Sequence, residues 1–367
     1  MATRKDREYM SLVLNLAEKG RYHTSPNPMV GAVIVKGNRK ISTGYHRQVG
    51  GDHAEVAAFK NATRSVRGAT LYVNLEPCCY TGRTGPCTKA IIKAGIKRVV
   101  VASRDPNPRV NGKGLKELRE AGISVDTGLM RSEAIRLNES YFANYRNKRP
   151  FVVLKMAQSL DGRIATNNGD SNWISSAPSL KMVHQLRAEY DGVVVGMGTA
   201  IADNPSLTVR HVKGNNPYRI VLTSSMKFPR NCHLLKDNKD YKTIIAGPKK
   251  SADGFVKTKQ GENLIFWHIR KKSNGQLDIA DLVQKAGNFG LRSLLVEGGQ
   301  QVATEFLRAN LVDKLILVLA PMLLGKGINA VGNLKIPRIA DAFSFEKYEF
   351  SPLGKDCVFI GYPRRSR

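Results

Sequence analysis

The sequence contains no apolar run of the roughly 20 residues that a membrane-spanning helix needs. It also has little cysteine, with five in 367 residues, and three of these, Cys78, Cys79 and Cys87, lie close together. An odd, clustered set argues against a disulfide framework and for a reducing compartment. Residues 1–20 mix acids into an amphipathic helical pattern, which is unlike a signal peptide. We therefore expect a soluble, cytoplasmic protein with no membrane partner.

Acidic residues are scarce, at 30 Asp and Glu against 58 Lys and Arg, which gives a formal net charge of +28. Such an excess can indicate nucleic-acid binding. Here, however, the basic residues are spread along the chain in short clusters, with no long basic block and no interleaved aromatic array. The charge also suits a phosphorylated substrate and a phosphorylated cofactor. We do not expect nucleic acid as a partner.

The length predicts two domains, because 367 residues are too many for one ordinary core. There is no internal repeat and no low-complexity tract. In the first half, strands predicted at 30–35, 69–75 and 97–102 alternate with helices at 7–19, 53–61, 87–94 and 113–121. This alternation favours an α/β fold around a mixed or parallel sheet.

A second α/β series begins near Phe151. It follows a basic segment, Asn144–Pro150, which ends in a proline. We expect a domain over residues 1–146 and another over 150–367. The strands predicted for the second domain are 151–157, 192–195, 219–222, 243–246, 263–267, 293–296 and 314–319.

The most informative motif is His53-Ala54-Glu55, followed by Pro77-Cys78-Cys79 and Pro86-Cys87. One imidazole and two thiolates are typical ligands of a catalytic zinc with an open fourth position. His-x-Glu followed by Pro-Cys and a further Cys is the pattern of zinc deaminases, in which the Glu moves protons. The spacing departs from the common Cys-x-x-Cys, because eight residues separate Cys78 from Cys87.

Other interpretations of these residues remain open. Adjacent cysteines can simply be buried, since a free cysteine packs like a small apolar residue. A structural, four-coordinate zinc would need a fourth ligand, for which Cys79 and His46 are the nearby candidates. Of the adjacent thiols, we predict Cys78 as the ligand because it directly follows the proline.

Further motifs narrow the family. In the first half they are Thr24–Gly31 (TSPNPMVG), Gly44–His46, Glu76–Cys78, Thr81–Cys87 and Asp105–Pro108; in the second they are Lys155–Arg163 (KMAQSLDGR), Ser171–Ile174, Asp203–Arg210 and Val296–Gly299. With the zinc motif, this series closely resembles the bifunctional deaminase/reductase of riboflavin biosynthesis, over nearly the whole chain.

The resemblance implies a cytidine-deaminase-like N-terminal domain and a dihydrofolate-reductase-like C-terminal domain. The first would hydrolyse the 2-amino group of 2,5-diamino-6-(ribosylamino)-4(3H)-pyrimidinone 5′-phosphate. The second would use NADPH to reduce the ribosyl group of 5-amino-6-(5-phosphoribosylamino)uracil to ribityl. Because relatives associate through the reductase domain, a homo-oligomer, either dimer or tetramer, is expected.

For the deaminase, the resemblance implies one Zn²⁺ per chain held by His53, Cys78 and Cys87, with Glu55 as the catalytic proton carrier. Asn27 and His46 are expected to line the substrate site. Small departures from the family pattern exist, since Ala32 stands where many relatives have Cys and Asp52 where Pro is expected.

The reductase half has no Gly-x-Gly-x-x-Gly turn. Instead, a predicted strand runs into Glu297-Gly298-Gly299 and then a helix, whose free N–H groups could bind phosphate. The cofactor positions that the resemblance implies are Ala157, Trp173, Thr199, Asp203, Ser224, Gly299, Gln300, Gln301, Val302, Ala303, Thr304 and Glu305. The implied substrate positions are Ser171, Arg187, Leu207, Arg210 and Glu297. Guanidinium groups such as those of Arg187 and Arg210 suit a substrate phosphate.

Two alternative functions would use the same zinc ligands. One is a tRNA-type deaminase with a basic RNA-binding extension, which only the net charge favours and the reductase-like half opposes. The other is a non-catalytic zinc module, against which the intact Glu55 argues.

Overall fold

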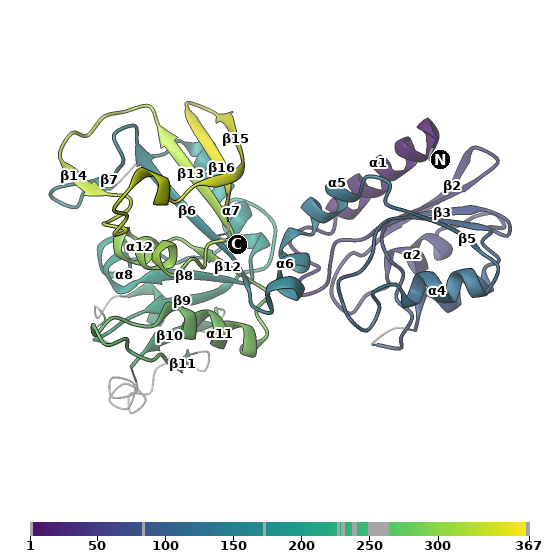
Figure 1. Cartoon of the computed structure of the whole chain (residues 1–367), viewed down its shortest axis with the longest axis horizontal. Helices are drawn as coiled ribbons and strands as arrows, with labels where there is room; N and C mark the ends of the chain where they lie inside the picture. Colours follow the sequence, from purple (N-terminus) through teal and green to yellow (C-terminus); the bar gives the residue numbers. More distant parts are fainter. Residues whose placement is uncertain are drawn as a thin grey trace. The chain divides into compact units, whose positions relative to one another are not determined.

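A computed structural model of the chain describes residues 3–82, 85–171, 174–225, 228, 232–236, 241–248 and 264–364. The chain forms two compact units, Met1–Lys148 and Arg149–Arg367. Each unit has an α/β fold, which confirms the predicted fold class (Figure 1). Among the described residues, no helix has both the length and the apolar character that crossing a membrane requires.

The first unit is built on a five-stranded mixed sheet with the strand order β2-β1-β3-β4-β5. Strand β1 is antiparallel to β2 and β3, whereas β3, β4 and β5 run parallel. The elements are α1 (Arg4–Glu18), β1 (Gly31–Lys36), β2 (Arg39–Tyr45), α2 (Ala54–Lys60), β3 (Thr70–Leu75), α3 (Cys87–Lys93), β4 (Arg98–Ser103), α4 (Lys113–Glu120), β5 (Ser124–Thr127), α5 (Arg131–Leu137) and α6 (Glu139–Asn147). The sequence does not predict β2 and β5, because these edge strands carry few apolar residues: β5 is largely exposed, and the buried positions of β2 are Ser42 and Gly44.

Helices cover both faces of this sheet. Alternate residues of a strand point to opposite faces, so Ile34 and Val33 of β1 belong to different cores. The core that contains Ile34 is closed by α2, α3 and α4, and the core that contains Val33 is closed by α1 and α5. The sheet is therefore buried on both sides, as the apolar central strands predict.

The second unit contains a nine-stranded sheet with the order β11-β10-β9-β8-β12-β6-β13-β16-β15 and a small sheet of β7 and β14. The strands from β11 to β13 are parallel, and β16 is antiparallel to β13 and β15. The elements are β6 (Phe151–Ser159), β7 (Arg163–Thr166), α7 (Ala177–Glu189), β8 (Gly192–Gly196), α8 (Met197–Asp203), β9 (Tyr218–Leu222), α9 (His233–Lys236), β10 (Thr243–Gly247), β11 (Leu264–His268), α11 (Ile279–Phe289), β12 (Ser293–Val296), α12 (Gln300–Arg308), β13 (Lys314–Ala320), β14 (Gly327–Asn329), the 3-10 turn η1 (Ile339–Asp341), β15 (Phe345–Leu353) and β16 (Asp356–Pro363).

The parallel strands decide where a ligand can bind in this unit. Their carboxyl ends meet at one edge of the sheet, which is the usual ligand-binding edge of an open α/β sheet. Helices α11 and α12 pack on one face through an apolar core that includes Leu282 and Phe306. Strands β7, β14, β15 and β16 were not predicted; β15, for example, is exposed or half-exposed along its whole length.

A buried carboxylate, Asp6, connects α1 to the sheet of the first unit. Its side chain accepts hydrogen bonds from the Tyr72 hydroxyl (2.6 Å), the Arg98 guanidinium (2.9 Å) and the Thr3 backbone N–H (2.8 Å), the last as part of a capping box. Burial works to raise the pKa of Asp6, but the Arg98, Tyr72 and Thr3 hydrogen bonds outweigh it and hold that pKa well below its usual range.

We predict that Asp6→Asn destabilises the first unit by about 3 kcal/mol, because it leaves Arg98 without its buried partner. The contribution of Asp6 is present above the ordinary carboxyl pKa of about 4 and is lost as the pH falls, because the folded-state pKa is depressed. Calorimetry of the full chain at pH 7 and pH 3 measures both effects. Asp126→Asn is the matched control, because Asp126 pairs with the same Arg98 at the surface and should contribute less than about 1 kcal/mol. Equal effects of the two substitutions would contradict the prediction.

Candidate active sites

Three potential metal ligands of the first unit lie where loops meet helix starts. His53 is the N-cap of α2 and Cys87 is the first residue of α3. Cys78 lies in the segment between β3 and α3, and its sulfur accepts a hydrogen bond from the Cys87 backbone N–H at 3.4 Å. The positive end of a helix stabilises a thiolate, so the Cys87 N–H at the start of α3 favours the ligating form of Cys78.

The ligand atoms of these residues are close enough to share one ion. His53 Nδ1 lies 3.2 Å from Cys87 Sγ and 3.5 Å from Cys78 Sγ. All three atoms lie within 4.8 Å of one another, and within the described part of the chain no other His, Cys, Asp and Glu side chains form such a group. Nitrogen and sulfur ligands on one tetrahedral zinc would be about 3.5 Å apart, given bond lengths of roughly 2.0 and 2.3 Å. The donor set and its spacing therefore fit Zn²⁺.

The neighbouring thiol, Cys79, lies outside this group. It is half-buried, and its sulfur is directed to the Arg109 carbonyl oxygen at 3.7 Å. Burial is the largest cause that raises the pKa of Cys79. By contrast, a hydrogen bond with Cys87 is the largest cause that lowers the pKa of Cys78, to about 4.

Glu55 lies beside the cluster in the first turn of α2 and is only 3% exposed. Burial is the main cause that raises its pKa to about 6, and the charge of Cys78 adds to this effect. Its carboxyl group is hydrogen-bonded to the Cys87 side chain. A carboxyl group with a pKa near neutrality can both take up and release a proton.

His46 and Asn27, both predicted at the substrate site, contact each other next to the cluster. His46 Nδ1 is 3.0 Å from the Asp52 carbonyl oxygen, which can only accept, so this nitrogen carries the proton. Nε2 then accepts from the Asn27 amide nitrogen at 3.2 Å. Burial lowers the pKa of His46, which favours this neutral form. The side-chain oxygen of Asn27 is thereby left as the acceptor of that amide.

A further carboxylate, Glu76, holds the backbone around the cluster, a role that its place in the Glu-Pro-Cys motif does not reveal. It accepts from the backbone N–H groups of Asp105, Gly112 and Leu115 at 3.2, 2.9 and 3.2 Å. Three hydrogen bonds from distant residues fix the segment just before Cys78 against the start of α4.

The second unit contains a cleft of about 1510 Å³ along the carboxyl ends of its parallel strands. This volume exceeds the roughly 300–1,000 Å³ of a typical small-ligand site, so the cleft has room for two ligands. The predicted residues that line it are Ala157, Ser171, Arg187, Thr199, Asp203, Arg210, Ser224, Glu297, Gly299, Gln300, Gln301, Val302 and Glu305.

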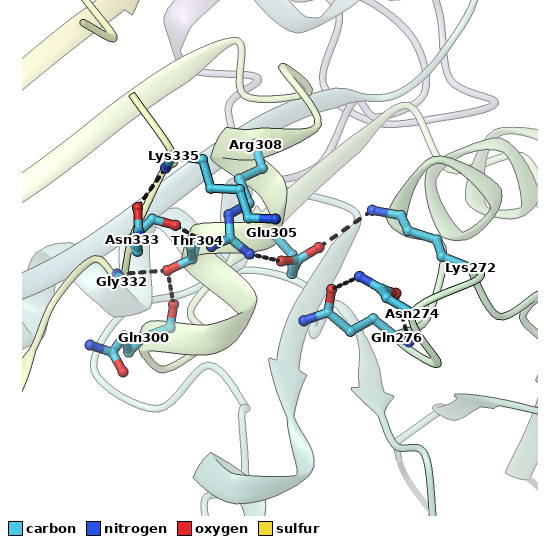
Figure 2. A network of polar contacts seen from close by, with 10 residues as sticks. All are labelled: Lys272, Asn274, Gln276, Gln300, Thr304, Glu305, Arg308, Gly332, Asn333 and Lys335. Atoms are coloured by element: carbon cyan, nitrogen blue, oxygen red, sulfur yellow. Dashed lines mark hydrogen bonds and ion pairs between the residues drawn. The ribbon is translucent and has the colours of Figure 1, made fainter. Parts of the chain in front are cut away.

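The remaining predicted positions do not line the cleft. Leu207 is buried, with a backbone φ of +53° that is uncommon for a side chain of this size. Ala303 and Thr304 are buried in α12. The Thr304 hydroxyl donates to the Gln300 carbonyl oxygen (2.6 Å) and accepts from the Gly332 N–H (2.8 Å), as Figure 2 shows. Trp173 lies outside the described residues.

Three charged side chains that line the cleft, Arg187, Glu297 and Lys155, are buried or half-buried. Arg187 Nε and Nη2 donate to the two carboxylate oxygens of Glu297, each at 2.8 Å. Burial opposes the charge of Glu297, but Arg187 and then Lys155 outweigh it and lower the pKa of Glu297. Lys155 also lines the cleft, and burial lowers its pKa. Lys155 is not among the predicted site residues, although a single lysine in the apolar strand FVVLKMAQS was a usable signal.

The start of α12 presents backbone N–H groups to this cleft. Gly299 is the N-cap and supplies no side-chain hydrogen bond, and its own N–H donates to the Thr199 hydroxyl at 3.1 Å. A Cβ at Gly298 would lie 2.6 Å from the Val302 side chain. Gly298 is thus needed for packing, whereas Gly299 leaves the helix start open to a ligand.

Comparison with protein families divides the chain in the same order. Residues 3–103 match the cytidine and deoxycytidylate deaminase zinc-binding region. Residues 150–359 match the RibD C-terminal domain.

Characterised relatives match along nearly the full length. The riboflavin biosynthesis protein RibD of Aquifex aeolicus is 41% identical, with 97% of this chain and 98% of that protein covered. The Escherichia coli RibD is 37% identical, with coverages of 97% and 99%. Acinetobacter baumannii RibD superposes with a TM-score of 0.86 at 34% identity, covering 99% of both chains. A Thermotoga maritima diaminohydroxyphosphoribosylaminopyrimidine deaminase/5-amino-6-(5-phosphoribosylamino)uracil reductase superposes with a TM-score of 0.82 at 33% identity, covering 98% of both. The chain therefore belongs to the RibD family of bifunctional riboflavin biosynthesis enzymes, with a deaminase domain followed by a reductase domain.

Proposed function

We propose that the first unit deaminates 2,5-diamino-6-(ribosylamino)-4(3H)-pyrimidinone 5′-phosphate and that the second reduces the product, 5-amino-6-(5-phosphoribosylamino)uracil, with NADPH. The observation that carries this proposal is that a potential zinc cluster with a buried carboxyl group lies in one unit and a charged two-ligand cleft in the other. The name of the Thermotoga maritima relative supports the choice of substrates. The proposed functional domains are residues 1–146 and 150–367.

We assign His53, Cys78 and Cys87 as the ligands of one Zn²⁺ per chain, supported by the donor types and the spacing of 3.2–3.5 Å. When bound, zinc supplies a water of lowered pKa for attack on the amino-bearing ring carbon. Glu55 takes the two protons of this water in turn, giving the first to the ring nitrogen and the second to the amino group, which leaves as ammonia. The Asn27 amide oxygen, oriented by His46, accepts a hydrogen bond from the substrate.

In the reductase, bound NADPH would supply a hydride to the ribosyl C1′, whose bond to the ring oxygen would break. That oxygen takes a proton, which yields the ribityl chain. Lys155 lines the cleft, and we assign it to donate this proton, because burial lowers its pKa and so favours proton release. Because Glu297 already occupies the fork of Arg187, Arg210 is the better candidate for the substrate phosphate and Arg187 serves to hold Glu297. The remaining predicted substrate position that lines the cleft is Ser171.

The cofactor phosphates are assigned to the start of α12, where Gly299 leaves the N–H groups of the first turn open. NADPH rather than NADH is proposed, because a strongly basic chain can pair the additional 2′-phosphate with Lys or Arg.

We also propose a cytoplasmic homo-oligomer that associates through the reductase unit. The strand β15 supports this assembly, because it lies at the end of the sheet among the described strands and exposes Tyr348 and Phe350 at 65% and 59%. All five cysteines are free thiols, in line with a reducing compartment.

The ligand assignment predicts that Cys78→Ser and Cys87→Ser each lose zinc, whereas Cys79→Ser retains it. The Cys79 sulfur is directed to a backbone carbonyl and not to the cluster. Metal analysis of the three purified variants, with calorimetry to verify folding, measures this. If the Cys79→Ser variant lost zinc and the Cys78→Ser variant kept it, the ligand would be Cys79 and not Cys78.

We predict that Glu55→Gln lowers deamination by at least about 10²- to 10⁴-fold, because an amide keeps the shape but cannot carry the proton. Zinc content and NADPH-dependent reduction of supplied deaminated substrate should remain normal. The wild-type protein and the variant are incubated with the diaminopyrimidinone, with and without NADPH, and the products are identified by mass. Near-normal ammonia release by the variant would remove Glu55 from the mechanism. Unchanged substrate with the wild type would refute the proposed function.

Gly299→Asp should weaken NADPH binding at least tenfold, because it places a negative side chain where the phosphates approach the start of α12. A Cβ at Gly299 would meet the Thr199 hydroxyl at 3.2 Å, so Gly299→Ala is the control that separates crowding from charge. Fluorescence titration with NADPH gives both affinities. Unchanged affinity of the Asp variant would mean that the phosphates bind elsewhere.

A further inference from the structure

A short hairpin between β11 and α11 forms part of the cleft wall. It spans Arg270–Asp278 and is closed by a bridge between Lys271 and Leu277 and by the Lys272 N–H donating to the Gln276 carbonyl oxygen at 2.7 Å. Gly275, at a φ of +79°, makes the turn. Three consecutive residues of this hairpin, 275–277, line the cleft. None of them is among the positions that the sequence motifs predict.

The hairpin lies at the end of the cleft that is far from the buried charges. Lys155 is on β6 and Leu222 ends β9, and the strand order β9-β8-β12-β6 separates them by three strand spacings, or about 14 Å. Helix α12 runs along the cleft: Glu305 is six residues beyond Gly299, or about 9 Å along the helix axis. If the phosphates bind at Gly299, the end near the hairpin receives the part of the dinucleotide beyond them.

This end of the cleft has apolar walls with polar groups among them. Leu222, Leu277 and Ile279 line it together with Gln276 and Glu305. Apolar walls suit the faces of a flat heteroaromatic ring, and a few fixed polar groups suit its edge. The hydrogen-bonding direction of Gln276 and Glu305 therefore decides which base can bind.

Asn274 fixes the direction of the Gln276 amide. The Asn274 amide nitrogen donates to Gln276 Oε1 at 2.8 Å, and Asn274 Oδ1 accepts from the Gln276 backbone N–H at 3.1 Å. Figure 2 shows the Gln276 amide oxygen toward Asn274 and the amide nitrogen on the opposite side. Gln276 thus offers a donor to a ligand.

Glu305 offers the opposite polarity. It is 6% exposed, and its carboxylate lies between Arg308 Nη1 at 2.8 Å and Lys272 Nζ at 3.4 Å (Figure 2). A carboxylate only accepts hydrogen bonds. Lys272 also connects the hairpin to α12, so the contact that holds Glu305 keeps Gln276 near it.

We propose that Gln276 and Glu305 together recognise adenine, and so determine which base of a dinucleotide this reductase accepts. Glu305 accepts from the exocyclic amine, and the Gln276 amide nitrogen donates to the adjacent ring nitrogen. Adenine presents this donor beside an acceptor along one edge. Hypoxanthine carries a carbonyl oxygen in place of the amine, which would face the carboxylate of Glu305. The proposal rests on the assignment of the cleft to NADPH.

The test compares equilibrium binding of NADPH with that of its hypoxanthine analogue, measured by fluorescence titration of the full chain without substrate. The wild type should bind NADPH about 10- to 100-fold more tightly, the effect expected of one mismatched buried polar group. Gln276→Ala should weaken NADPH binding. Asn274→Ala should weaken it less, because it removes only the hydrogen bond that orients the Gln276 amide. Glu305→Gln should bring the two affinities within about threefold, because an amide can also donate to the carbonyl oxygen. Ser273→Ala, in the same exposed turn, is the control that should preserve the wild-type ratio.

Equal affinities of the wild type for the two dinucleotides would overturn base recognition and leave the reductase function intact. Failure to bind either dinucleotide would overturn both. Because Glu305 is buried, its substitution could disturb the fold, so the affinities of Glu305→Gln are compared only if its melting temperature equals that of the wild type. Gln276→Ala is on the partly exposed hairpin and decides independently: an unchanged affinity for NADPH would remove the hairpin from recognition.

Discussion

The close packing of α2 against β2 is the contact on which the first site depends. It occurs at Gly44, where a Cβ would lie 2.3 Å from the Ala54 carbonyl oxygen and 2.4 Å from the Ala58 nitrogen. Only glycine lets the helix backbone come this close. The position of α2 in turn sets His53, its N-cap, and Glu55, in its first turn. A shift of α2 by less than an ångström would alter the spacing of the metal ligands. It would also alter the distance between the Glu55 carboxyl group and those ligands.

In the second unit the corresponding constraint is electrostatic. Glu297 and Arg187 are 110 residues apart, and each would be costly to bury alone. Together they place a fixed, hydrogen-bonded pair at the strand ends, and Lys155 adds a third charge. The low dielectric strengthens the interactions among these groups, so they can orient a substrate without reorganising. Packing determines the geometry of the deaminase site and charge that of the reductase site.

The sequence predicts helices, central strands and metal-ligand types better than it predicts which residues pair in the folded chain. The zinc motif could be recognised because His53, Cys78 and Cys87 belong to three short segments with strong chemical preferences. The apolar central strands could be recognised for the same local reason. The edge strands β2 and β15 could not, because the buried positions of β2 are Ser42 and Gly44 rather than apolar residues, and β15 is exposed or half-exposed throughout. The pairing of Arg187 with Glu297 is a property of the tertiary fold, and no local pattern contains it. The hairpin Arg270–Asp278 was missed because its polar residues are typical of any surface turn.

The distribution of acids gives a physical account of the high positive charge. In the part of the chain that the structure describes, eight acidic residues are buried but only two basic ones, Arg187 and Arg219. Several of these acids, including Asp6, Glu76 and Asp356, hold backbone N–H groups or the starts of helices. The exposed charged side chains are therefore more predominantly basic than the composition alone indicates. A positive field of this kind raises the local concentration of anions. Such a field favours phosphorylated ligands over neutral ones.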